Sequence, residues 1–263
     1  MARPDFRKGR CVTPVPPVPQ TLSQRGRIFV VDAGRGSAVA LMVGFHFCFD
    51  LNYFNLARFD FYFSPFWLVA RAIIVTLFLF LVGISLQLAS TGGLKLTAYF
   101  RRLVLLAVCA GMVSAASYGM FPDSGIFFGV LHFIFVASIL GLLFTRFNYI
   151  NLLAGTGWIA AGLIFQNSWF DQPWLNWIGF MTHKPVTEDY VPLFPWFGVV
   201  LLGLCAGRWV TGRETATGWR AWRSTGKPSL LMVWLGRNSL AVYMLHQPLL
   251  LGGLYLASRF WHQ

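Results

Sequence analysis

The chain has 263 residues, of which 56% are hydrophobic and only 11% are charged, and its formal net charge is +12. Soluble domains of this length are nearer half apolar and a quarter charged, so the composition excludes an ordinary soluble domain. Nucleic-acid-binding proteins are also basic, but here the basic residues lie between long apolar runs, as the positive-inside rule for membrane proteins predicts. We therefore expect no nucleic-acid partner.

Apolar runs long enough to cross a bilayer core of roughly 30 Å as helices recur along the chain. The predicted spans are 28–49, 66–89, 103–121, 126–144, 149–165, 193–210 and 239–258. The sequence thus predicts an all-α, polytopic membrane helix bundle of about seven transmembrane helices, in which residues 28–263 form a single domain. No internal repeat is visible, so the inverted-repeat signature of many secondary transporters is absent.

Residues 1–27 precede the first span and combine six basic residues with the Pro-rich stretch "TPVPPVPQ". They contain no apolar core of a signal peptide. This composition predicts a disordered cytoplasmic tail. None of the four cysteines forms a CxxC pair and three lie in apolar runs, so neither a disulfide nor a metal site is expected.

The first predicted span carries four ionisable residues, Asp32, Arg35, His46 and Asp50. At about 100° per residue they fall on one stripe of a helix, which runs roughly 27 Å from end to end. Asp32 and Arg35 are spaced to neutralise each other, and Asp50 is spaced to hold the imidazole of His46. Such pairs can simply join helices, but intramembrane ionisable residues are functional by default, and His46 suits general base catalysis.

Two more histidines lie in predicted spans, His132 in "GVLHF" and His246 in "GRNSLAVYMLHQP". A lone buried histidine is more often a packing residue than a catalyst, but three together favour a polar bundle interior. In the second motif Gly236 interrupts the chain, and Asn238 or Ser239 can cap the following helix. A capped helix N-terminus next to an arginine, here Arg237, is a ready anion site.

The charges between the spans predict the topology. With the N-terminus inside, the inner segments hold Lys95, Arg101, Arg102, Arg146, Arg208, Arg213, Arg220, Arg223 and Lys227. The outer loops hold Arg58, Lys184, Asp60, Asp123, Asp171, Glu188 and Asp189. This asymmetry predicts an N-inside, C-outside arrangement, and it explains Arg101 and Arg102 as well as an anionic ligand does.

Four blocks of sequence, in four different spans, resemble a known family. They are "VDAGRGSAVALMVGFHFCFDL", "GVLHFI", "DYVPLFPWFGVVLLGLCAG" and "LGRNSLAVYMLHQP". In this order they resemble the heparan-alpha-glucosaminide N-acetyltransferase catalytic-domain family, in its short bacterial branch. The resemblance implies a transmembrane acyltransferase of the bacterial inner membrane. Such proteins move an acyl group, usually acetyl, from cytoplasmic acyl-CoA to an acceptor, often a sugar, on the outer side.

The resemblance also implies roles for individual residues. Those that would hold the CoA phosphates are Arg35, Arg101, Arg102, Arg237 and Asn238. His46, oriented by Asp50, would deprotonate the acceptor or carry the acyl group transiently. The residues that would line the acceptor side are His132, as a further catalytic candidate, Asp189, Trp196 and His246. The implied partners are acetyl-CoA as co-substrate, membrane lipid and a glycan or other extracytoplasmic acceptor, with no metal and with a homodimer as one conceivable assembly.

Two other functions remain open for the same residues. A small transporter or proton-coupled permease could use the intramembrane Asp and His residues, although the missing repeat and the small size argue against it. A non-enzymatic membrane subunit could use them for packing alone. Binding or hydrolysis of acetyl-CoA by the purified protein separates these functions, because neither alternative predicts it.

Overall fold

The computed structural model describes residues 28–212 and 223–261, and every regular element within these two ranges is helical. The α-helices are α1 (Phe29–Tyr53), α2 (Pro65–Thr91), α3 (Leu96–Met120), α4 (Val130–Phe144), α5 (Tyr149–Ile164), α6 (Leu193–Gly212), α8 (Lys227–Arg237) and α9 (Ser239–Trp261). A short 3-10 helix follows α5 at Ser168–Asp171. The predicted all-α class is thereby confirmed for these ranges. The tail 1–27, Arg213 and Arg220 lie outside the described residues.

Seven of these helices lie at the predicted spans, and four are long and apolar enough to cross a membrane: α2, α3, α6 and α9. They support an integral membrane protein. The helices α4 and α5 are apolar but shorter, with 15 and 16 residues. The helix α1 has 25 residues, but its ionisable stripe lowers its mean hydropathy. The count of seven transmembrane helices therefore stays a prediction.

The hydrophobic core lies where α2, α4 and α6 meet. Leu79, Phe133, Phe197 and Leu201 are almost fully buried there. Glycines bring the helix backbones together: a Cβ on Gly83 of α2 would meet the backbone of α6. Small residues at helix crossings are the usual means by which membrane helices approach closely.

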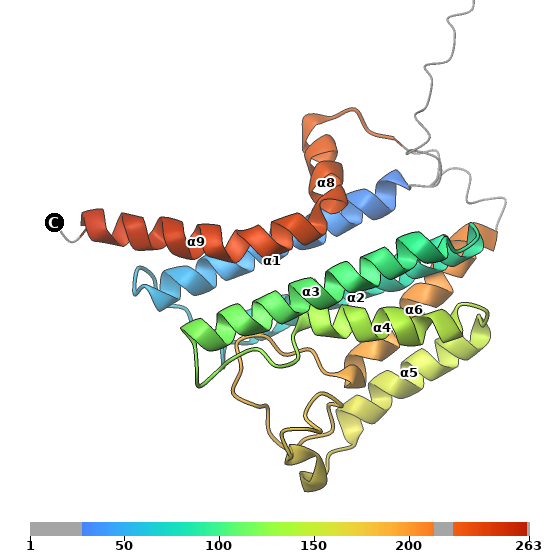
Figure 1. Ribbon diagram of the computed structural model, residues 1–263, viewed down its shortest axis with the longest axis horizontal. Coiled ribbons are helices and arrows are strands. Elements are labelled where there is room, and N and C mark those ends of the chain that lie inside the picture. The colour runs from blue at the N-terminus through green and yellow to red at the C-terminus, as the bar shows by residue number, and fades with distance from the viewer. Residues whose placement is uncertain (1–27, 213–222, 262–263) are drawn as a thin grey trace, which may run out of the picture.

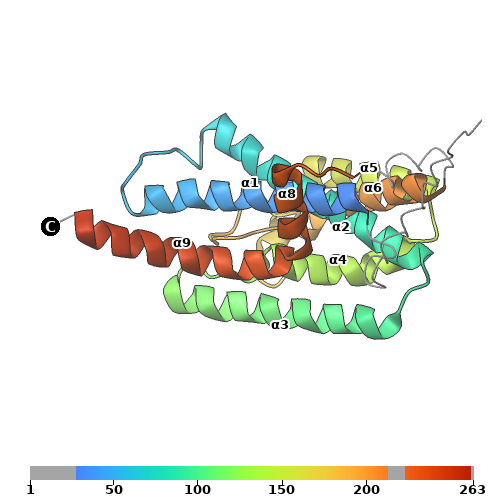
Figure 2. The same ribbon diagram turned by 90° about the horizontal axis from the view of Figure 1, so that it is seen from above.

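The helix α8 was not predicted, because we expected Gly236 to interrupt the chain. Gly236 instead lies in the last turn of α8, which crosses α1 (Figure 1, Figure 2). A Cβ on Gly36 of α1 would meet the backbone of Met232, and a Cβ on Gly236 would meet the backbone of Asp32. The two glycines thus allow direct backbone contact. After Asn238, α9 runs beside α1 toward the opposite end of the molecule (Figure 1, Figure 2).

The helices α1 to α6 alternate in direction, so their connections gather at two ends of the molecule (Figure 1). The connections α2–α3 and α4–α5 lie at the end where α1 begins (Figure 1) and hold Lys95 and Arg146; Arg208 joins them there, because it donates to the carbonyls of Thr145 and Arg146. Acidic residues occupy connections on the other side, namely Asp60, Asp123, Asp171 and Glu188. The acidic connections also hold Arg58 and Lys184, and the N-inside, C-outside orientation stays a prediction.

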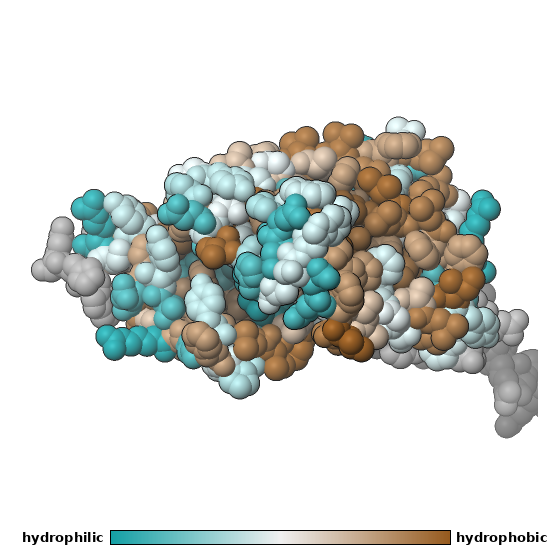
Figure 3. All heavy atoms as spheres, turned by 90° about the horizontal axis from the view of Figure 1, so that it is seen from below, coloured by the Kyte–Doolittle hydropathy of each residue, from teal (hydrophilic) through white to brown (hydrophobic). Residues whose placement is uncertain are grey.

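The surface around α5 is apolar. Figure 3 shows hydrophobic side chains gathered over the half of this face where α5 lies, and hydrophilic ones over the other half. Leu153, Leu163 and Ile164 of α5 are all exposed. Such a surface suits contact with the hydrocarbon of a bilayer.

Candidate active site

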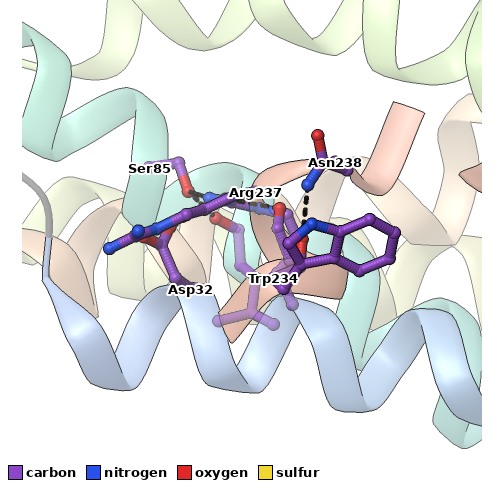
Figure 4. Close-up of polar contacts among 8 residues, drawn as sticks. Asp32, Ser85, Trp234, Arg237 and Asn238 are labelled. Carbon is purple, nitrogen blue, oxygen red and sulfur yellow. Dashed lines mark hydrogen bonds and ion pairs between the residues drawn. The ribbon is translucent and has the colours of Figure 1, made fainter. Parts of the chain in front are cut away.

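Asp32 is buried near the start of α1 and binds one arginine with each carboxylate oxygen. Oδ1 accepts from Nη1 of Arg35 at 3.3 Å, which confirms the pairing predicted from their spacing. Oδ2 accepts from Nε of Arg237 at 3.3 Å, across the crossing of α1 and α8 (Figure 4). Arg35 Nη2 also donates to Ser85 Oγ of α2 at 2.6 Å. We call Asp32, Arg35, Ser85 and Arg237 the arginine cluster; its two guanidinium groups outnumber its one carboxylate.

A cavity of about 320 Å³ lies beside the arginine cluster. The residues that line it include two arginines, Arg223 and Arg237, and two aromatic residues, Phe29 and Trp234. Guanidinium groups bind phosphates in bidentate fashion, and aromatic faces stack on flat rings. Arg223 was predicted only as a topology signal, because nothing in a basic loop reveals which of its side chains lines a cavity.

Three further residues were predicted to hold the CoA phosphates, Arg101, Arg102 and Asn238, and none of them contacts the cavity in the described contacts. Arg102 is exposed on α3, and no hydrogen bond or ion pair of the described residues joins it to the arginine cluster. Arg101 is exposed, and nothing in the described contacts places it there. We expected Asn238 or Ser239 to cap the following helix, but the side chain of Asn238 does not do so. Its Nδ2 donates back to the carbonyl of Trp234 at 2.9 Å and so closes α8 (Figure 4).

Farther along α1, His46 meets His246 of α9. The ring centroids lie 4.9 Å apart with the planes inclined by 68°. His46 Nδ1 lies 2.9 Å from the carbonyl of Met42, and His246 Nδ1 lies 2.6 Å from the carbonyl of Tyr243. A carbonyl only accepts, so each neutral ring carries its proton on Nδ1 and keeps a lone pair on Nε2. Both histidines therefore present Nε2 as a base.

The structure corrects the partner of Asp50. We expected this carboxylate to hold His46, but Oδ1 accepts from Gln247 Nε2 of α9 at 2.7 Å. His46 is held instead by the carbonyl one turn earlier in its own helix, which already occupies Nδ1. Asp50 is only 1% exposed, and its Oδ2 has no partner among the described residues.

His132 has both ring nitrogens engaged at the start of α4. Nδ1 accepts from the backbone N–H of Gly129 at 3.3 Å. Nε2 therefore carries the proton and faces Ser114 Oγ at 3.2 Å, and that hydroxyl donates to the carbonyl of Ile126. This arrangement favours a capping role for His132 over a catalytic one.

Asp189 lies in the connection before α6 and also contacts the start of α4. Its Oδ2 accepts from the backbone N–H of Val130 at 2.7 Å and from the hydroxyl of Tyr243 at 3.4 Å. Burial raises the pKa of Asp189. Tyr243 was not predicted, yet it links two predicted residues, because its hydroxyl binds Asp189 and its carbonyl binds His246.

Trp196 of α6 packs against the hydrophobic core. No contact of the described residues joins it to the histidines, so its predicted role in substrate binding has no geometric support here. Within residues 28–212 and 223–261, no group of three His, Cys, Asp or Glu side chains could hold a metal ion.

Apolar helices thus carry an ion-paired cluster with two arginines and, farther along α1, two histidines whose Nε2 atoms can accept a proton. This arrangement is that of an integral membrane protein with side chains suited to group transfer. The family model "Heparan-alpha-glucosaminide N-acetyltransferase, catalytic" matches residues 27–248, which include every residue of the clusters described above. The chain belongs to this family and is a membrane acyltransferase, as the resemblance implied. No curated protein and no solved structure matches the chain significantly.

Proposed function

We propose that the protein transfers an acetyl group from acetyl-CoA to a sugar hydroxyl or amine. The observation that carries this proposal is the order of polar groups along α1, with the arginine cluster near its start and the paired histidines beyond. Arg35 and His46 are 11 positions apart, or roughly 16 Å of helix rise. The extended pantetheine arm of CoA suits such a separation between phosphate site and reaction site.

The donor would bind from the end where α1 begins. Arg223 and Arg237 would contact phosphates, and Trp234 would stack on the adenine ring at the cavity that these side chains line. The excess positive charge of the arginine cluster supports an anionic ligand. Asp32 would keep Arg35 and Arg237 in place before the donor arrives.

The chemical step needs one base. As the acceptor oxygen or nitrogen attacks the thioester carbonyl carbon, His46 Nε2 would take its proton. The new acyl bond forms, the carbon–sulfur bond breaks, and the CoA thiolate takes the proton from the imidazolium. The products are the acylated acceptor and free CoA, and His46 returns to its starting state.

The function is tested by incubating purified protein with labelled acetyl-CoA and either glucosamine or glucose. We expect label on the sugar, and we expect Arg237→Gln to weaken acetyl-CoA binding by about tenfold or more, since a charge-assisted hydrogen bond contributes roughly 1.5–3 kcal/mol. Arg58→Gln is the control, because Arg58 is exposed in the connection after α1, away from the cavity. Equal affinity of both variants, or no acetyl-CoA binding by the wild type, would contradict the proposal.

The proposal includes sidedness: the donor comes from the cytoplasm, the acceptor is outside, and the membrane is a bacterial inner membrane. The separation of basic from acidic connections supports it. In a cysteine-free chain, Lys184→Cys should react with an impermeant thiol reagent in intact cells, whereas Lys95→Cys should react only after lysis. Both positions are exposed and lie outside the helices. Labelling of position 95 in intact cells would refute the assigned orientation.

A further inference from the structure

Asp50 and Gln247 form an isolated polar pair between α1 and α9. The amide Nε2 of Gln247 donates to Asp50 Oδ1 at 2.7 Å. Reversing the amide would place its oxygen against the carboxylate, so this orientation is fixed by charge. The pair joins residues 197 positions apart in the sequence.

Half of this pair's hydrogen-bonding capacity is unused. Asp50 Oδ2 and Gln247 Oε1 are both buried, and neither has a partner among the described residues. Buried acceptors without donors cost free energy, and a carboxylate oxygen costs the most. Pro248, the next residue, has no N–H, so the carbonyl of Met244 also lacks its usual intrahelical donor. All of these unfilled groups are acceptors.

The chemistry of a matching ligand follows from the kind of atoms left unpaired. A phosphate, a carboxylate or the carbonyl of a thioester brings only acceptors and would be repelled. A group with several O–H or N–H donors would complete the pair. The CoA side of the reaction therefore does not fit here, whereas a hydroxyl-bearing or amine-bearing acceptor does.

We propose that Asp50 and Gln247 bind the donor-rich part of the acceptor and determine which acceptors the enzyme uses. This inference rests on the proposed acyl transfer. Asp50 lies four residues beyond His46, or roughly 6 Å along α1. Likewise Gln247 follows His246, whose ring packs on His46. An acceptor held by the pair would thus bring a neighbouring hydroxyl or amine to Nε2 of His46.

The test compares Gln247→Met with Gln87→Met. Gln87 is also a helical glutamine that is 1% exposed and has an unpartnered Oε1, but it lies on α2 next to Gly207 of α6. We expect Gln247→Met to raise KM for glucosamine or glucose by about tenfold, near the upper end of what the loss of one neutral hydrogen bond predicts. Affinity for acetyl-CoA should stay unchanged in both variants, and Gln87→Met should keep the wild-type KM.

The two sugars show which hydrogen-bond donors of the acceptor the pair binds. If KM rises for glucosamine alone, Asp50 and Gln247 bind the ammonium group. If KM rises equally for glucose, they bind hydroxyl groups. The exchange variant Asp50→Asn with Gln247→Glu restores one carboxylate and one amide, so it should recover part of the acceptor affinity lost in Gln247→Glu. An unchanged acceptor KM in Gln247→Met, or no recovery in the exchange variant, would overturn the inference.

Acceptor binding is also measured without turnover, as the sugar-induced rise in Tm of each purified variant. If the wild type binds a sugar but transfers no acetyl group, the proposed function fails while the binding pair survives. If the wild type transfers acetyl and Gln247→Met gives the same sugar-induced rise in Tm as the wild type, the binding pair fails while the proposed function survives.

Discussion

Replacement of His46 by alanine is expected to lower acetyl transfer by about 10²–10⁴-fold, the usual contribution of a general base. The reason lies in the tautomer: the carbonyl of Met42 holds the Nδ1 proton and leaves Nε2 as the proton acceptor. Acetyl-CoA binding should persist, because the arginine cluster lies at the other end of α1. The measurement is transfer rate and acetyl-CoA affinity on the same purified variant.

His183→Ala is the matched control for this prediction. His183 is an exposed histidine in the connection before α6, where it pairs with Asp171 at 3.7 Å. Its loss should change neither transfer nor binding. If His46→Ala keeps near wild-type turnover, the base must be His246, whose Nε2 is also unprotonated by the same reasoning and is buried without a partner.

The fold was largely predictable because long apolar runs leave few alternatives to membrane helices. The helix α8, Lys227–Arg237, is too short to form such a run, and it ends near Gly236, where the sequence predicts an interruption of the chain. Its position depends on Gly36 and Gly236, which meet only after the chain has folded. Sequence spacing alone identifies a glycine but not its neighbour.

The candidate site was predictable where partners share one helix. The spacing of Asp32 and Arg35 gave the correct ion pair. The same reasoning failed for His46 and Asp50, since a carbonyl of α1 and an amide of α9 compete successfully for these two side chains. Gln247 and Ser85 were missed because their partners lie on α1, and Tyr243 was missed because its hydroxyl binds Asp189 of the connection before α6; no local pattern records such separations. A polar residue next to His246 was the available signal for Gln247.

Replacement of Gly236 by alanine is expected to cost about 3 kcal/mol or more of folding free energy. Overpacking alone costs roughly 1–3 kcal/mol. Here the added Cβ would meet the backbone of Asp32 in α1, which cannot rotate away as a side chain can. The helix α8 must then move off α1, and the ion pair between Arg237 and Asp32 must lengthen. Weakening this contact adds to the cost because Asp32 is buried and would lose one of its two charged partners, although Arg237 itself is partly exposed.

Gly44→Ala, in the α1 helix that α8 crosses, is the control, because a Cβ at Gly44 meets nothing within 4 Å. It should be neutral or slightly stabilising, since alanine favours helix over glycine by roughly 0.5–1 kcal/mol. Unfolding of both variants in one detergent gives the comparison, and acetyl-CoA affinity gives the second readout.

Gly236→Ala should lose affinity as well as stability, because the displaced α8 carries Trp234 and Arg237 away from the cavity that they line. Equal unfolding free energies for the two variants would show that α8 does not depend on backbone contact with α1. If Gly236→Ala loses stability but keeps its affinity for acetyl-CoA, the contact of α8 with α1 stabilises the fold without being needed for donor binding.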